Sequence, residues 1–512
     1  MSKSHRTNFD FPSLPSRELC LYIIVVVVCV IYSYHQTYIY SSTYDWKHGN
    51  QKFVIDHLWF FGEKIKDSSD VRWMQWKILM AKMIPYLIIH SLLFNLGQLV
   101  LPDTAWSALM LAYWMTATVL TFGSTITVQV IVIGILLYAI ASLTRKKWPV
   151  WMAVAGILLI TAGDIFALEL YSDWFTQLAL VLYKLIQYIT FCVDTIDSKT
   201  IDKKSFLRGL YDMFFYAFYF PYQISLIVPF HQFRDSFDSR NVRKTQTAEI
   251  CILGMRLLFW YTIIETAFHF FYFSAMVTDL KQLEKLPTSI LCCMGSIVAQ
   301  FFHMEYMLIF GLPGLFARLD KLEPPALPIC ISRCMSYKQT WRSFDRGMYK
   351  FFKCYVVLPF CQPSFSAGRR LVSLIMCCLF ALTRHRFQRN CIAWMMLNVV
   401  GMIVEHILDS LFANVVVQQW RRNLVTGRTV RRLRAILSLI PFIFKVYAHF
   451  YFLTSFEAGN IFFQKLFLFE TLHFKPLAIV LLICGYCFSN VVIELERRNY
   501  SKGIVPQKSA VK

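Results

Sequence analysis

The sequence predicts an all-α, polytopic membrane protein, with about ten to twelve membrane helices and re-entrant elements around a central chamber. Three observations lead to this fold class. Of the 512 residues, 57% are hydrophobic and only 16% are charged, and the mean hydropathy is +0.48. The apolar runs repeatedly reach the roughly 20 residues that a helix needs to cross a bilayer. Short basic clusters separate these runs, as in the cytoplasmic loops of membrane proteins.

The net charge of +21 comes largely from such clusters, at 145–147, 199–208, 240–244 and 421–434. The last of these is expected to be cytoplasmic. No soluble portion is left to present a nucleic-acid-binding element, so no nucleic-acid partner is predicted. The charge favours the bilayer's anionic headgroups, or an acidic ligand such as a coenzyme A thioester. Most of the fifteen cysteines lie in apolar runs, where they behave as small hydrophobic residues, and no metal site is predicted.

One membrane domain is expected between two polar ends. Residues 1–18 form a polar N-terminal segment, 19–496 the domain, with a polar centre at 319–405, and 497–512 a polar tail. The run at 19–40 lacks a cleavage site, so an uncleaved helix is predicted, and the tryptophan-rich stretch 41–76 is expected along the membrane interface. The other apolar runs lie at 78–101, 105–122, 124–143, 149–170, 174–193, 249–278, 287–317, 391–417, 433–455 and 476–496.

Polar residues within these runs need partners or a function. Asp164 and Lys184 are expected near a helix end or paired inside the bundle. Glu265 and His269 stand four apart, which predicts one helical face and a paired structural cluster rather than a metal site. In the segment 206–230, two prolines predict a bend beside a cavity.

The polar centre carries the residues that can do chemistry. Three prolines between Leu319 and Ser332 predict a loop. The stretch from Asp345 to Pro359 is too short for a clean crossing and predicts a re-entrant or in-plane element. A short apolar run then ends at His385. Burial and two flanking arginines should keep this imidazole neutral, as a general base must be.

A structural interpretation of the same residues is also open. A histidine at the end of an apolar helix is more often structural than catalytic, and Asp345 could simply pair with Arg342 or Arg346. Both residues lie, however, in one segment whose pattern predicts a protein-lined cavity. This favours a functional site.

The chain resembles the membrane-bound O-acyltransferase family, and within it the Hedgehog acyltransferase branch. The interval of 40 residues between Asp345 and His385 is the one expected for that branch. Weaker similarity runs from Arg17-Glu18-Leu19 to Gly485-Tyr486. The pieces that carry the resemblance are Pro324-Pro325-Ala326-Leu327-Pro328 with Cys330, Trp341-Arg342-Ser343-Phe344-Asp345-Arg346-Gly347, Tyr355, Pro359, His385, Trp394, Leu397-Asn398 and Val404-Glu405.

This resemblance implies roles for five residues. His385 would be the catalytic base and Asp345 a second polar residue of the active site, while Trp341 and Asn398 would line the chamber. Cys330 matches the position at which such enzymes hold a haem b through its thiolate; a plain loop cysteine is the open alternative. The implied donor is palmitoyl-CoA, and the implied acceptor is a secreted signalling protein with a free N-terminus. The implied location is the endoplasmic reticulum membrane, with the Golgi as the alternative.

The chain departs from the family beside its histidine. The family usually has Trp-His-Gly, whereas this chain has Arg384-His385-Arg386. The change leaves three alternatives open: a retuned palmitoyltransferase, a catalytically impaired paralogue that binds acyl-CoA or haem, and an acyltransferase with a lipid acceptor. A transporter or receptor is disfavoured because no transporter-like repeat is visible.

Overall fold

The computed structural model describes residues 12–46, 52–58, 62–162, 174–243, 247–330, 334–413, 426–466 and 476–501. Asp164 and the arginines at 421 and 422 lie outside them.

Within these ranges, ten helical stretches are long and apolar enough to cross a membrane. Polytopic all-α architecture is therefore confirmed. The spanning elements are α1 (Ser16–Ser42), α2 (Val71–Val100), α3 (Asp103–Phe122), α4 (Ser124–Thr144), α6 (Trp174–Asp197), α9 (Thr247–Ala267), α12 (Thr288–Leu319), α17 (Arg389–Ala413), the consecutive α19 (Gly427–Leu437) and α20 (Leu439–Leu453), and α22 (Pro476–Ser501).

Shorter elements fill the spaces between these helices. They are α5 (Lys147–Ala162), α7 (Phe206–Ala217), η2 (Phe220–Tyr222), α8 (Phe230–Asp238), α10 (Phe273–Thr278), α11 (Leu280–Lys285), α13 (Tyr337–Ser343), α14 (Arg346–Phe351), η4 (Phe352–Val357), α15 (Leu358–Cys361), α16 (Ala367–Arg384) and α21 (Phe456–Phe463). The helical segment formed by α14, η4 and α15 is not among the ten stretches, so its re-entrant character remains a prediction.

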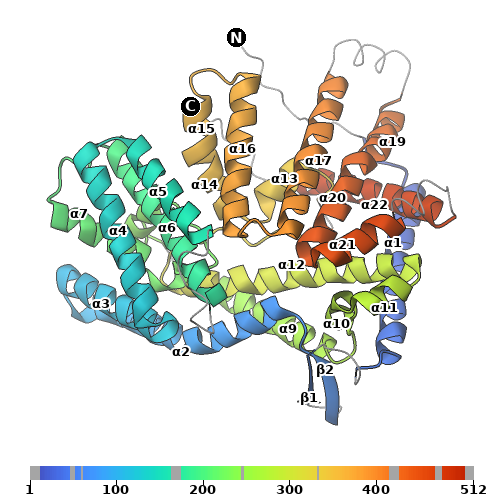
Figure 1. The fold of residues 1–512 in the computed structure, drawn as a ribbon, viewed down its shortest axis with the longest axis horizontal. Coiled ribbons are helices and arrows are strands. Elements are labelled where there is room, and N and C mark those ends of the chain that lie inside the picture. Colours follow the sequence, from blue (N-terminus) through green and yellow to red (C-terminus); the bar gives the residue numbers. More distant parts are fainter. Residues whose placement is uncertain are drawn as a thin grey trace.

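Helix α12 lies at the centre of the fold and crosses the middle of the molecule in Figure 1. It packs against α1, α2, α9 and α20. One hydrophobic cluster gathers mainly residues of α2, α3, α4, α6 and α7, and a second gathers those of α9, α12 and α20. Helices α13 to α17 stand over α12, where they bring the polar centre to the middle of the bundle.

The helix break predicted near Pro221 and Pro229 is present, because α7 ends at Ala217 and α8 begins at Phe230. Buried side chains satisfy the backbone that the break frees. Lys184 of α6 donates to the carbonyl oxygen of Ala217, and Gln187 donates to that of Tyr222 over 3.0 Å. Lys184 is therefore paired inside the bundle, as expected.

A two-stranded antiparallel hairpin within 41–76 was not predicted. Strand β1 (Phe53–Leu58) pairs with β2 (Gly62–Asp67), with Phe53 opposite Asp67 and Leu58 opposite Gly62. A two-stranded hairpin is only marginally stable alone. Contacts with α9 stabilise this hairpin: the Lys66 ammonium of β2 lies 2.6 Å from the Glu265 carboxylate.

The expectation for Glu265 and His269 was partly wrong. The apolar run at 249–278 is not one helix, because α9 ends at Ala267 and leaves His269 beyond it. Glu265 accepts hydrogen bonds from Trp73 and Lys66, each over 2.6 Å. His269 joins the same cluster, because it lies 3.7 Å from Asp56, which pairs with Lys66 at 3.0 Å. The pairing is structural, as predicted, but its partners are distant in sequence.

Candidate active site

His385 lies just after the last residue of α16, in the turn that leads to α17. Its backbone N–H donates to the Leu382 carbonyl over 3.0 Å, which ends the helix. The next two residues, Arg386 and Phe387, have φ angles of 51° and 50°. This left-handed pair reverses the chain, so that α17 starts at Arg389 and runs back beside α16 (Figure 1).

The His385 imidazole is enclosed by aromatic rings. Its centroid lies 5.9 Å from the Trp394 ring of α17 and 5.6 Å from the Phe452 ring of α20, edge to face in both cases. The ring nitrogens make no hydrogen bond to any residue in the described ranges. Within those ranges, both nitrogens keep their full hydrogen-bonding capacity.

Burial lowers the pKa of His385 to about 4, and the charge of neighbouring Arg384 adds to this effect. Desolvation and a nearby like charge both penalise the imidazolium. The ring is consequently neutral at pH 7, the state in which it can accept a proton. Arg386 is not among the groups that lower this pKa.

Asp345 caps the N-terminus of α14. Its carboxylate accepts a hydrogen bond from the Met348 N–H over 2.8 Å. Among the described residues neither Arg342 nor Arg346 forms an ion pair with it, so the helix cap is the structural role that Asp345 has. Burial raises the pKa of Asp345, while the cap hydrogen bond and the positive charge of Arg384 act in the opposite direction.

Arg384 joins the two residues electrostatically. Its guanidinium donates to the Tyr183 hydroxyl over 2.8 Å and lies 5.0 Å from the centre of that ring. Its charge acts on His385 and on Asp345 alike. The structure thus brings Asp345 and His385, distant in sequence, into one electrostatic neighbourhood, and the arginine that departs from the family pattern lies within it.

Trp341 and Asn398 reach the site through Trp394. The rings of Trp341 and Trp394 lie 5.8 Å apart. Asn398 is 4% exposed, and its side-chain N–H donates to the Trp394 carbonyl of its own helix over 2.7 Å. Trp341 therefore joins Trp394 and Phe452 in one aromatic wall beside His385, whereas Asn398 is buried and donates to the backbone of its own helix.

Three further aromatic residues complete the wall: Phe302 and Phe452, which sequence reasoning missed, and Phe344, which the motif at 341–347 contains without an assigned role. Phe302 of α12 stacks on Phe344 at 5.4 Å and meets Phe452 at 5.7 Å. Phe344 directly precedes Asp345, so this contact connects the surroundings of Asp345 with those of His385. Phenylalanines in an apolar run carry no distinguishing signal, because such runs are rich in them.

Polar side chains hold α13 in place. The buried carboxylate of Glu405 accepts from the Ser336 hydroxyl over 2.6 Å and from the Tyr337 N–H over 2.5 Å. Lys445 of α20 donates to the Thr340 hydroxyl over 2.6 Å. Glu405 is one of the residues that carry the resemblance to the acyltransferase family. Lys445 could have been noticed as a lysine in an apolar run. At Gly401 a Cβ would lie 2.2 Å from the Tyr337 ring, so this contact requires glycine.

Cys330 is half-buried in the loop after α12, and its carbonyl oxygen faces the Cys334 thiol at 3.7 Å. The described residues include no group of three or more His, Cys, Asp or Glu side chains that could hold a metal ion. No feature of this geometry supports a haem at Cys330. No step of the mechanism below depends on one.

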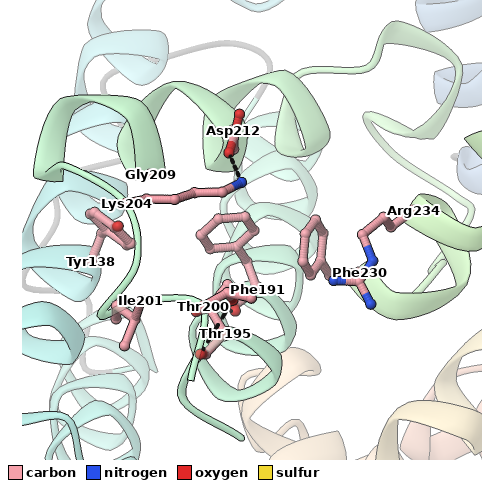
Figure 2. A pocket seen from close by; sticks show the side chains of 10 residues that line it. All are labelled: Tyr138, Phe191, Thr195, Thr200, Ile201, Lys204, Gly209, Asp212, Phe230 and Arg234. Carbon is pink, nitrogen blue, oxygen red and sulfur yellow. Dashed lines mark hydrogen bonds and ion pairs between the residues drawn. The ribbon is translucent and has the colours of Figure 1, made fainter. Parts of the chain in front are cut away.

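The cavity shown in Figure 2 lies away from these residues. Tyr138, Phe191, Gly209 and Phe230 help to line it, and Lys204 reaches across to Asp212 over 2.5 Å. Its volume of about 50 Å³ is far too small for an acyl chain. This cavity is therefore not the chamber that the sequence predicts.

Fold and site together define a multi-pass membrane protein that holds a neutral imidazole, a buried carboxylate and an arginine among aromatic rings inside its helix bundle. The model of the membrane-bound O-acyltransferase family matches residues 23–447. The chain belongs to this acyltransferase family.

Three curated proteins are similar to the chain over most of its length. The mouse protein-cysteine N-palmitoyltransferase HHAT is 24% identical over 94% of this chain and 98% of its own length. The Drosophila melanogaster protein-cysteine N-palmitoyltransferase Rasp is 23% identical over 69% of this chain and 70% of its own. The mouse protein-cysteine N-palmitoyltransferase HHAT-like protein is 23% identical over 67% of this chain and 69% of its own length.

Proposed function

We propose that the chain transfers a palmitoyl group from palmitoyl-CoA to the N-terminus of a secreted Hedgehog-like or other signalling protein. The transfer would take place at the endoplasmic reticulum membrane, with the Golgi membrane as the alternative. Family membership and the names of the similar proteins support this function. The observation that carries the proposal is the neutral His385 imidazole, which has no hydrogen bond to another described residue and lies in one electrostatic neighbourhood with Asp345.

In the proposed mechanism, His385 takes a proton from the amine or thiol of the acceptor as that group attacks the thioester carbonyl. A bond from the nucleophile to the acyl carbon forms, the carbon–sulfur bond breaks, and the coenzyme A thiolate leaves with the proton that His385 gives back. Arg384 supplies positive charge for the oxyanion that develops. Trp341, Trp394 and Phe452 exclude water from the reaction.

Asp345 orients the site in this proposal, because its carboxylate fixes the start of α14 and balances the charge of Arg384. Asn398 supports the Trp394 wall. Acyl-CoA would keep its charged head on the cytosolic side and its chain in the bundle, and the acceptor N-terminus would approach from the lumen.

The acceptor class can be tested in microsomes that contain the full chain. They receive labelled palmitoyl-CoA together with a peptide that has a free N-terminus, with the same peptide N-acetylated, or with a lysophospholipid. We expect label on the free peptide and none on the acetylated one. Label on the lysophospholipid alone would replace the proposal with a lipid acyltransferase.

A second candidate is a catalytically impaired paralogue that binds acyl-CoA. It is favoured by the low pKa of His385, about 4, to which burial and the charge of Arg384 both contribute. A base with so low a pKa accepts protons poorly at neutral pH. Microsomes that bind acyl-CoA but label none of the acceptors would support this second candidate.

A further inference from the structure

Glu305, in the middle of α12, is a buried acidic group that the mechanism above does not use. It is 1% exposed, and neither carboxylate oxygen has a hydrogen-bond partner in the part of the chain that the structure describes. Buried polar groups in proteins almost always have such partners. An unpartnered buried carboxylate is therefore a place where a ligand group is expected.

The residues around Glu305 leave one negative charge unbalanced. The Asp70 carboxylate and the Arg72 guanidinium are the charged groups that act on it. Asp70 caps α2 by accepting from the Trp73 N–H over 3.0 Å, and its other oxygen lies 3.4 Å from the Arg72 guanidinium. Two ionised carboxylates offer only acceptors to one another. They must share a proton or hold a cation between them.

This acidic pair, Asp70 with Glu305, lies directly behind the aromatic wall of the candidate active site. Phe302, one turn before Glu305, contacts Phe344 and Phe452. The Arg72 guanidinium lies over the Phe302 ring, 5.1 Å from its centre. The next residue along α12, Tyr306, lies 5.1 Å from Phe344 and within electrostatic reach of both Arg384 and Asp345.

One side of the pair faces outward. The Arg72 side chain is 32% exposed, whereas that of Asp70 is 9% exposed. Arg72 therefore lies at the solvent-facing edge of the cluster, and Glu305 lies at its closed end. A cationic group that enters past Arg72 meets two carboxylates, which favour a positive charge.

We propose that the acidic pair binds the α-ammonium group of the acyl acceptor. This inference rests on the proposed function, because it assigns to a peptide N-terminus the cation that replaces the shared proton. An α-amino group has a pKa of about 7.7–8 and enters the site largely as a cation. Its three N–H donors match the unpartnered oxygens and take the place of the shared proton. The pair holds the acceptor as it enters and does not act in the bond-forming step: the ammonium gives one proton to water and leaves the pair, and the neutral amine then attacks the thioester at His385.

The test compares two neutral variants, Glu305→Gln and Asp70→Asn. Asparagine is as good a helix N-cap as aspartate, so Asp70→Asn removes the charge and keeps the start of α2. Binding of a fluorescent peptide to the detergent-solubilised full chain is measured without acyl donor, once with a free N-terminus and once N-acetylated. Glu323→Gln is the matched control. Glu323 is 73% exposed, and it pairs with Arg243 and not with a residue of the acidic pair.

We expect the wild-type chain and Glu323→Gln to bind the free peptide about ten- to a hundredfold more tightly than the acetylated one, as for a charge-assisted hydrogen bond. Both neutral variants should lose this preference and still bind the acetylated peptide as before. If Glu305→Gln does not fold, Asp70→Asn carries the test.

The proposal is overturned if the wild-type chain shows no preference, or if both neutral variants keep it. In acyl-transfer assays of the two neutral variants, a lower kcat with an unchanged KM for the acceptor would also overturn it, because recognition of the acceptor would then be intact. A chain that prefers the free peptide but transfers no acyl group would support the acidic pair and contradict the proposed enzyme.

Discussion

At the scale of single residues, the turn after His385 is where the chain differs most from the family pattern. Arg386 has a φ of 51°, in the left-handed region that costs a non-glycine residue roughly 1–2 kcal/mol. Glycine, the usual family residue at this position, adopts the conformation without that cost. The hydrogen bonds from Arg386 to Thr383 and from Phe387 to Leu382, both 3.0 Å, hold the turn in spite of the strain.

Burial and the charge of Arg384 together lower the proton affinity of His385, so removal of Arg384 should change the pH dependence of transfer. His385 must be neutral to act as a base, so activity falls as the pH drops through its pKa of about 4. Arg384→Gln removes a positive charge and should move this acid limb upward, toward the ordinary value of ~6.5. The pH profile of kcat/KM measures the shift.

Arg384→Lys is the control for this prediction. It keeps the charge but not the planar group that meets Tyr183, so its acid limb should stay near that of the wild-type chain. An acid limb at the same pH in Arg384→Gln would mean that the charge of Arg384 does not act on the base.

At the scale of elements, Glu405 fixes α13 and with it Trp341 and the approach to Asp345. Glu405→Gln should cost about 1–3 kcal/mol, because the buried donors of Ser336 and Tyr337 lose a charged acceptor. We expect a lower thermal midpoint of the detergent-solubilised chain and slower acyl transfer. Both can be measured on the same preparation.

Lys338→Ala is the matched control on the same helix. Its ion pair with Asp409 is 2.6 Å long, but the lysine side chain is 53% exposed, and exposed pairs contribute ~0–1 kcal/mol. An equal loss of stability in both variants would show that α13 is not held mainly by Glu405.

The sequence was sufficient to predict the helical elements, because runs of about 20 apolar residues have one stable form in a bilayer. It also located the loop after α12 and the break near Pro221. It could not reveal the β-hairpin or the Glu265 partners, since contacts such as Lys66 with Glu265 join residues far apart in sequence. The acidic pair was missed for the same reason: Asp70 and Glu305 meet only in the folded chain.

The candidate site was predictable in part. His385, Asp345 and Trp341 could be named from motif spacing, and the effect of burial and of Arg384 on the His385 pKa follows from general electrostatics. The positions of Phe302 and Phe452 could not be predicted, because they depend on how α12 and α20 pack. Asn398 shows the limit of a motif: it locates the residue but not the direction in which its amide points.

At the scale of the whole molecule, α19 ties the two ends of the described chain together. Arg431 is 0% exposed and contacts the Glu494 carboxylate at 2.8 Å, the Asn490 carbonyl at 3.1 Å and the Pro12 carbonyl at 3.0 Å. Arg432 pairs with Glu18 of α1 at 2.6 Å. These arginines of the basic cluster are used in internal contacts, which places part of the net charge inside the fold.

Arg431→Ala should therefore destabilise the whole chain by about 3 kcal/mol, because the Pro12 and Asn490 carbonyls lose their donor and Glu494 loses its one fully buried partner. Arg432→Ala is the control, since that side chain is 37% exposed and its pair should contribute at most about 1 kcal/mol. Thermal midpoints of the purified variants give the comparison. Equal midpoints for both would contradict the clamp assigned to Arg431.

The central claim is that His385 and Asp345 catalyse acyl transfer in this chain in spite of Arg384 and Arg386. The most direct test measures transfer of labelled palmitate from palmitoyl-CoA to a peptide with a free N-terminus, in microsomes with the wild-type chain, His385→Ala or Asp345→Ala. We predict transfer by the wild-type chain, background label with His385→Ala and a strong reduction with Asp345→Ala. A His385→Ala chain as active as the wild type, or an inert wild-type chain that still binds acyl-CoA, would contradict the claim.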